Sequence, residues 1–121
     1  MYNKLFMDHI NNPRNLGALE DADMVGESEP GMDGDLIWLY LKVDKKGVIK
    51  EIRFKTFGCA MCVATSSYLT ELVKGMTLKK ARKVTIKDLS PLVEGLPEHK
   101  LYCYDKALNL LHSMIAAELK G

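Results

Sequence analysis

The sequence predicts an α+β fold, a small antiparallel sheet with its helices packed on one face. Two strand-like runs, LIWLYLKV and VIKEIRFK, are separated by only a few residues, so they should pair as neighbours. A short helical pattern precedes them and only helical patterns follow, an order that is typical of α+β domains. With 121 residues, 47% of them hydrophobic, we expect residues 1–121 to form a single domain around one core.

The N-terminal part predicts one short helix followed by a long loop. Tyr2, Leu5, Phe6 and Ile10 fall near one helical face. The segment NNPRN ends this helix, because the residue before a proline is driven out of helical geometry. A loop rich in Asp, Glu and Gly then runs to EPGMDGD, where proline and glycine leave the backbone irregular.

The two strand runs predict a hairpin with one solvated face. They are joined by DKKG, in which Gly47 suits a positive φ. In the second run Val48, Ile52 and Phe54 alternate with charged residues, as expected for a sheet with one wet face. The first run is apolar on both faces, so we expect it to lie centrally or beneath helices.

Helical periodicity governs the rest of the chain. A helix that starts near the cysteines should end at about Gly75. Two short helices, a loop and a long amphipathic helix follow, and the last helix should hold Cys103 in its first turn. The expected spans are 77–83 and 87–93 for the short helices and 94–100 for the loop.

Composition excludes several classes of partner. Seventeen basic and sixteen acidic residues give a net charge of +1, which does not indicate nucleic acid. No apolar run approaches the roughly 20 residues of a membrane helix, and the N-terminal residues do not lead into a secretory signal. We therefore expect a cytoplasmic protein that does not bind membranes. Three cysteines without an export signal favour metal binding or thiol chemistry over a disulfide framework.

The cysteines and a pair of aspartates predict a site at one edge of the domain. Cys59 and Cys103 should lie just before or at helix starts, where the helix dipole favours thiolate. The turn that contains Asp33 and Asp35 offers carboxylates at the entrance to a strand. If the two helix starts and this turn lie close together, Cys59, Cys103 and at least one carboxylate could bind zinc or iron.

Each of these residues also has a simpler interpretation. Cys62 is in phase with the core positions of its helix, so both burial and ligation stay open. Asp33 and Asp35 fit ordinary turn and cap positions. His99 precedes Cys103 in a loop and could reach a metal or simply face solvent. Cys59 favours chemistry more clearly, because its small neighbours, Gly58 and Ala60, leave space around the thiol.

Several longer segments match a known family in order along almost the whole chain. They are DHINNPRNLG from Asp8, GD at Gly34, RFKTFGC from Arg53 with ATSS after it, LVKGMTL from Leu72, and LPEHKLYC from Leu96. With these segments the chain resembles the IscU/SufU/NifU-N family of iron-sulfur cluster assembly scaffolds. The resemblance implies the fold of that family.

The resemblance also implies a ligand set and partners. In that family three cysteines and an aspartate hold a nascent [2Fe-2S] cluster or a zinc ion, and a cysteine desulfurase delivers sulfur to one thiol as a persulfide. The second family cysteine falls on Cys59, the third on Cys103 and the aspartate on Asp35. Cys103 is the candidate persulfide acceptor. The resemblance implies a scaffold or sulfur acceptor rather than an enzyme, with apo iron-sulfur proteins as recipients.

This chain departs from the family pattern at four places. Asp33 stands where the first cysteine is expected, and Tyr102 where a histidine often precedes the third. The loop that is typically LPPVK appears here as LPEHK, at residues 96–100, which puts recognition by an Hsp70-type chaperone in doubt. Cys62 occupies a position that is usually small and apolar, so three thiols are kept in a changed arrangement.

Two main hypotheses follow. In the first, Cys59, Cys62 and Cys103 with Asp33 or Asp35 bind a cluster transiently and pass it on, and the carboxylate keeps the cluster labile. In the second, Cys103 or Cys59 accepts a persulfide, with zinc or no metal ordering the site. A degenerate site on a domain that only binds partners is a third alternative. If Cys62 stays in the core, a stable cluster on one chain is not expected; whether two chains share one as a homodimer stays open.

Overall fold

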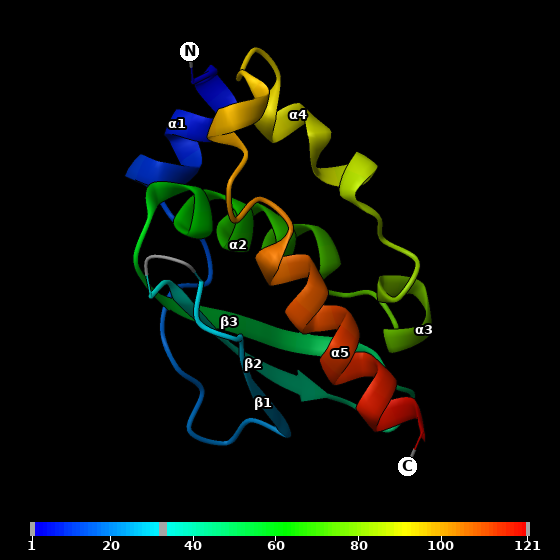
Figure 1. Ribbon diagram of the computed structural model, residues 1–121. Helices are drawn as coiled ribbons and strands as arrows, with labels where there is room; N and C mark the ends of the chain where they lie inside the picture. Colours follow the sequence, from blue (N-terminus) through cyan, green and yellow to red (C-terminus); the bar gives the residue numbers. More distant parts are fainter. Residues whose placement is uncertain (1, 32–33, 121) are drawn as a thin grey trace.

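The computed structural model describes residues 2–31 and 34–120, and its α+β architecture agrees with the prediction (Figure 1). One helix precedes three strands, and helices and short 3-10 turns follow them. The elements are α1 (Lys4–Asn11), β1 (Met24–Glu27), β2 (Leu36–Val43), β3 (Ile49–Phe57), α2 (Ala60–Val73), α3 (Leu78–Ala81), α4 (Ser90–Val93) and α5 (Lys106–Lys120), with 3-10 turns at Ile86–Leu89 and Glu98–Lys100.

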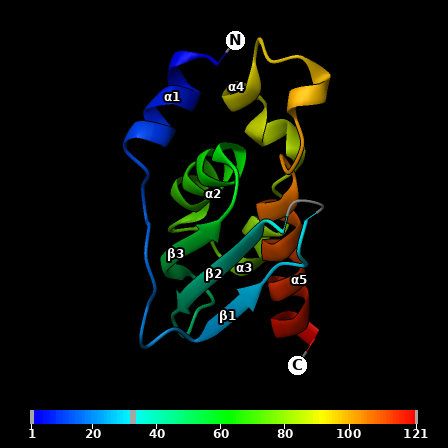
Figure 2. The same ribbon diagram turned by 60° about the vertical axis from the view of Figure 1, so that its left-hand side comes forward.

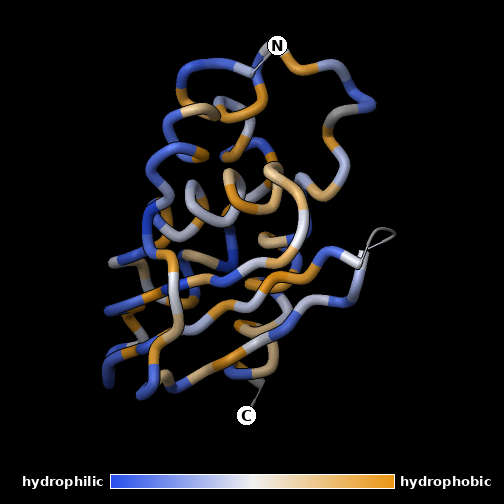
Figure 3. The backbone as a smooth tube through the Cα atoms, turned by 90° about the vertical axis from the view of Figure 1, so that its left-hand side faces the viewer, coloured by the Kyte–Doolittle hydropathy of each residue, from blue (hydrophilic) through white to orange (hydrophobic). Residues whose placement is uncertain are grey.

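The strands form one antiparallel sheet in the order β1-β2-β3. The central position of β2 confirms the expectation drawn from its apolar sequence. Its residues Ile37, Leu39 and Leu41 are fully buried and alternate with less buried neighbours. In Figure 3, hydrophobic and more polar positions follow one another along the backbone. The sheet therefore has one face in the core, as the second strand-like run predicted.

The short strand β1 was not expected from the sequence. It pairs with β2 in the register Val25 to Tyr40 and lies where a loop was predicted. Gly26 at its middle lets α5 approach, because an added Cβ would lie 2.5 Å from Sδ of Met114. Four residues that include a glycine carry too little alternating pattern to predict a strand.

Helix α2 lies between the sheet and a second layer formed by α1 and α4 (Figure 2). It is therefore buried on nearly all sides, including its run of small polar residues, Thr65, Ser66 and Ser67. Thr65 Oγ1 donates to the carbonyl of Met61 at 2.8 Å, so its hydroxyl is satisfied within the helix. Small side chains allow close packing on both sides of α2, which fixes the position of its N-terminus.

The outer layer is held by polar contacts. Asn3 caps α1 by accepting a hydrogen bond from the Phe6 amide at 2.8 Å, and its side-chain amide donates to the carbonyl of Leu92 at 3.2 Å in α4. His9 is buried, with Nδ1 2.7 Å from the Ser67 hydroxyl. This contact joins α1 to α2. None of the helices in the described parts of the chain is long and apolar enough to cross a membrane.

Candidate metal centre

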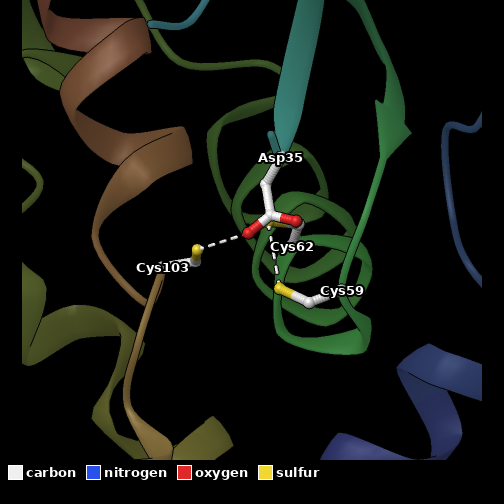
Figure 4. A group of neighbouring side chains, drawn as sticks. All are labelled: Asp35, Cys59, Cys62 and Cys103. Atoms are coloured by element: carbon white, nitrogen blue, oxygen red, sulfur yellow. Dashed lines mark hydrogen bonds between the residues drawn. The ribbon is translucent and has the colours of Figure 1, made fainter. Parts of the chain in front are cut away.

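Four potential ligands from three separate segments of the chain meet at one edge of the domain (Figure 4). Asp35 comes just before β2, Cys59 and Cys62 lie at the start of α2, and Cys103 lies before α5. One ligand atom of each lies within 4.8 Å of those of the other three. The structure thus brings together the two cysteine-bearing segments and the aspartate turn that the sequence predicted to lie at one edge. Asp33, the other carboxylate considered, lies outside the described residues.

The N-terminus of α2 presents two thiols side by side. Strand β3 ends at Phe57, and Gly58 turns the chain with a φ of +133°, a conformation that favours glycine. Cys59 is the N-cap, yet its side chain makes no capping hydrogen bond, so its Sγ stays available for the site. The Sγ atoms of Cys59 and Cys62 are 3.3 Å apart.

The structure places Cys62 in the hydrophobic core and also beside the other candidate ligands. It is fully buried and packs in the main core cluster, yet its Sγ borders Cys59 and the ligand group. Helix α2 begins at Ala60, and Cys62 in its first turn lies within the candidate ligand group without any unwinding of the helix start. The first turn of α2 thus directs the Cys62 side chain toward the hydrophobic core and the candidate ligand group at the same time.

The sequence had predicted Cys103 in the first turn of the last helix. In the structure it lies three residues before that helix. Residues 102–105 form a turn, α5 starts at Lys106, and Cys103 has a φ of +69°. A non-glycine residue in this left-handed region costs about 1–3 kcal/mol and is a feature that clusters at functional sites. The conformation directs the thiol toward β2, where Sγ donates to Oδ2 of Asp35 at 3.1 Å.

Asp35 is held tightly although it lies next to a loop. It is only 3% exposed, and its carbonyl accepts a hydrogen bond from Nζ of Lys106 at 2.8 Å. Its carboxylate packs against Gly58, where an added Cβ would lie 2.2 Å from Oδ1. The sequence showed Gly58 only as a small neighbour of Cys59 and gave no sign of Lys106. These two contacts join segments distant in sequence, so no local pattern could reveal them.

Burial favours the protonated form of the Cys62 and Cys103 thiols in the metal-free site. Burial raises the pKa of Cys62 to about 12, and the neighbouring Cys59 adds to the rise. The pKa of Cys103 is also raised, first by burial and then by its hydrogen bond to Asp35. Thiolate is the form that binds metal, so a cation entering this site must displace protons. Such a site binds metal more tightly as pH rises.

Two residues of the site, Cys103 and Cys59, are partly accessible to solvent. A cleft of about 660 Å³ is bounded by Cys103, Lys106 and Tyr102 on one side and by residues 27–31 on the other. Cys59 is half-buried, whereas Cys62 is closed off from solvent. His99 is exposed and is not part of the ligand group found among the described residues, which fits the simpler of its two interpretations.

Comparisons with known proteins agree on one family. The model of the NifU-like N terminal domain matches residues 1–119. The iron-sulfur cluster assembly scaffold protein IscU 1 of Archaeoglobus fulgidus is 44% identical over 115 residues, which cover 95% of this chain and 74% of that protein. IscU of Aquifex aeolicus is also 44% identical, with 94% of this chain and 73% of that protein covered.

Solved structures show the same fold at lower sequence identity. The N-terminal part of a NifU-like protein from Brucella abortus has a TM-score of 0.73 and 22% identity, covering 98% of this chain and 95% of that one. FiSufU from Fervidobacterium islandicum has a TM-score of 0.72 and 22% identity, covering 94% and 96%. The match over residues 1–119 and the relatives at 44% identity show that the chain belongs to the NifU-like N-terminal domain family.

Proposed function

We propose that this protein is a scaffold on which iron and sulfide assemble into a [2Fe-2S] cluster that is then passed on. The observation that carries the proposal is the group of Asp35, Cys59, Cys62 and Cys103, with ligand atoms within 4.8 Å of one another. Thiolates are the usual ligands of iron-sulfur clusters. The names of the relatives from Archaeoglobus fulgidus and Aquifex aeolicus, iron-sulfur cluster assembly scaffold proteins, support the same function.

In this proposal Cys62 supplies the third thiolate in place of the missing first cysteine. Its Sγ lies 3.3 Å from that of Cys59, so it can join the ligand set without movement of the helix. Asp35 supplies an oxygen, which binds iron of a cluster less firmly than a fourth thiolate would. A mixed ligand set of this kind suits a protein that must release its cluster.

A single zinc or ferrous ion is the second candidate, and the compactness of the site favours it. With zinc–sulfur bonds of about 2.3 Å, tetrahedral geometry places ligand atoms about 3.8 Å apart. The closest pairs in the site are 3.3 Å for Cys59 and Cys62 and 3.1 Å for Cys103 and Asp35, so small adjustments would close it around one ion. A cluster with two metal ions needs a wider opening. A zinc-bearing sulfur acceptor, with Cys103 or Cys59 as the acceptor, is therefore the alternative function.

The scaffold proposal implies partners of defined chemistry. A cysteine desulfurase would supply sulfur, and apo iron-sulfur proteins would receive the product. The cleft beside Cys103 supports an approach from that side. The role is that of a scaffold or acceptor rather than of an enzyme. We propose a cytoplasmic location; the relatives include bacterial and archaeal proteins and also proteins named as mitochondrial.

Anaerobic reconstitution tests the proposal. Reduced protein is incubated with ferrous iron and inorganic sulfide, desalted, and examined for visible absorption, iron, acid-labile sulfide and zinc. We expect wild type to retain iron and sulfide in equal amounts and Cys62→Ala to lose both. Ser66→Ala is the matched control, because its buried hydroxyl lies one turn further along α2 and has no hydrogen-bond partner among the described residues.

Three outcomes are informative. A cluster in wild type and Ser66→Ala but not in Cys62→Ala supports the proposed ligand set. An equally stable cluster in Cys62→Ala shows that Cys62 is only a core residue. Absence of a cluster from all three proteins, together with stoichiometric zinc, contradicts the scaffold proposal and favours the zinc-bearing sulfur acceptor.

A further inference from the structure

The two thiols at the start of α2 are unequal in exposure. Cys59 is half-buried at the N-cap, whereas Cys62 is fully buried 3.3 Å behind it. Cys59 uses its side chain for no capping hydrogen bond. An accessible thiol backed by a buried one is the arrangement in which the first accepts a group and the second displaces it. Ligation of a metal does not by itself require this asymmetry.

We propose that Cys62 resolves a persulfide formed on Cys59 and thereby releases sulfide at the site. The inference rests on the proposed function in one respect, because it assumes that sulfur arrives as the persulfide of a donor thiol. It assigns the chain a second activity, the reduction of sulfane sulfur to sulfide by its own dithiol.

The two steps balance without another oxidant or reductant. First, a donor persulfide passes its outer sulfur to Cys59, giving Cys59–S–SH and the free donor thiol. Next, the sulfur of Cys62 bonds to Sγ of Cys59, the bond from Sγ to the outer sulfur breaks, and the Cys62 proton leaves with that sulfur as hydrogen sulfide. The sulfane sulfur gains two electrons, and the two cysteines lose one each as their disulfide forms.

The two sulfur atoms already lie close together. Their separation is 3.3 Å, and a disulfide bond is about 2.05 Å long, so the two atoms must approach by only a short distance. Cys59 is the N-cap, with extended backbone outside the helix, and no capping hydrogen bond holds its side chain in place. Cys103 is less suited, because its thiol is engaged with Asp35 at 3.1 Å and it comes from a separate segment.

Closing the disulfide has a consequence for metal binding. It removes two of the three thiols from the ligand group of Asp35, Cys59, Cys62 and Cys103. The released sulfide can enter a cluster on the same chain only after a dithiol reductant reopens the bond. Sulfide release and cluster binding would therefore alternate on this site.

The test uses metal-free, fully reduced protein with glutathione persulfide as the sulfur donor, under anaerobic conditions. Free sulfide is measured over time against a protein-free blank. Samples are then quenched with an alkylating agent for intact mass and disulfide mapping. We expect wild type to release one sulfide per chain above the blank and to lose the mass of two hydrogen atoms. Peptide mapping should place the disulfide between Cys59 and Cys62.

Two variants sharpen the test. Cys62→Ala should keep the mass of one added sulfur on Cys59 and release no sulfide above the blank. Ser66→Ala, buried on the same helix, should behave as wild type. Equal sulfide release by Cys62→Ala, a wild type that keeps the added sulfur, or a disulfide that maps to Cys103 would each overturn the proposal. The mapping on wild type decides the question even if Cys62→Ala folds poorly.

The result is separable from the scaffold proposal. Reconstitution with inorganic sulfide and excess reductant bypasses the persulfide step altogether. A wild type that binds a cluster under those conditions, yet releases no sulfide from the persulfide, refutes only the inference about Cys62. A wild type that releases sulfide and forms the disulfide, but binds no cluster, refutes only the scaffold.

Discussion

Replacing Gly58 by alanine should disturb the candidate metal centre through its carboxylate. Gly58 has a φ of +133°, and an added Cβ would lie 2.2 Å from Oδ1 and 2.9 Å from Cγ of Asp35. Ordinary contact begins at 3.4 Å, so the side chain of Asp35 must move away. It cannot move freely, because it is 3% exposed and accepts a hydrogen bond from Cys103.

Two effects of Gly58→Ala are expected, with separate magnitudes. The strained backbone should lower the free energy of unfolding of the metal-free protein by about 1–3 kcal/mol. Displacement of Asp35 should weaken zinc binding by about 10- to 100-fold, the range seen when the support of a metal ligand is lost. Chemical denaturation measures the first effect, and competition with a zinc-binding dye measures the second.

Gly47→Ala is the matched control for backbone strain. Gly47 has a φ of +79° in the hairpin loop, and its added Cβ would meet nothing within 4 Å. It should lose stability while keeping the zinc affinity of wild type. In a double-mutant cycle, Gly58→Ala should add little to Asp35→Asn if both act through the same carboxylate. Wild-type zinc affinity in Gly58→Ala, or full additivity with Asp35→Asn, would refute this reasoning.

Three further predictions concern charge, pH and packing. Lys106→Met removes the 2.8 Å hydrogen bond to the Asp35 carbonyl, and zinc affinity should fall about 10-fold; an unchanged affinity would show that the contact is dispensable. Burial raises the pKa of Cys62 from 9.0 to about 12, so above pH 9.0 the unfolded thiol ionises while the folded thiol stays protonated. The metal-free protein should therefore lose stability between those two values, and Cys62→Ala should lose less, when denaturation is compared at each pH. Asn3→Ala should cost about 1–2 kcal/mol in denaturation without altering zinc binding, because Asn3 caps α1 and donates to α4.

The sheet shows which parts of the fold the sequence could predict. The alternation of Ile52 and Phe54 with charged residues encodes a buried face directly, and Gly47 marks the turn, so β2 and β3 were predicted to within two residues. Strand β1 was missed because its pairing depends on β2 and on the space that Gly26 leaves for α5. The start of α5 was placed too early. The helical spacing of apolar residues continues on the N-terminal side of the helix, into the turn around Cys103.

The candidate site shows a different limit. Cys59 and Cys103 could be named as candidates in advance, because each was expected at or just before the start of a predicted helix. The turn before β2 offered both Asp33 and Asp35, and only the family resemblance pointed to Asp35. Cys62 could not be assigned, since helical phase gives a direction and does not distinguish the core from a site at its edge. The positions of Gly58 and Lys106 against Asp35 depend on tertiary packing between distant segments. Asp33 lies outside the described residues, and its role as a ligand stays a prediction.

The most direct test of the proposed ligand set is X-ray absorption spectroscopy on the zinc-loaded protein, with Cys62→Ala beside wild type. We expect three sulfur ligands and one oxygen in wild type, corresponding to Cys59, Cys62, Cys103 and Asp35. Cys62→Ala should lose one sulfur from the zinc shell. Two sulfur ligands in wild type and no change in the variant would contradict the assignment of Cys62 to the metal centre.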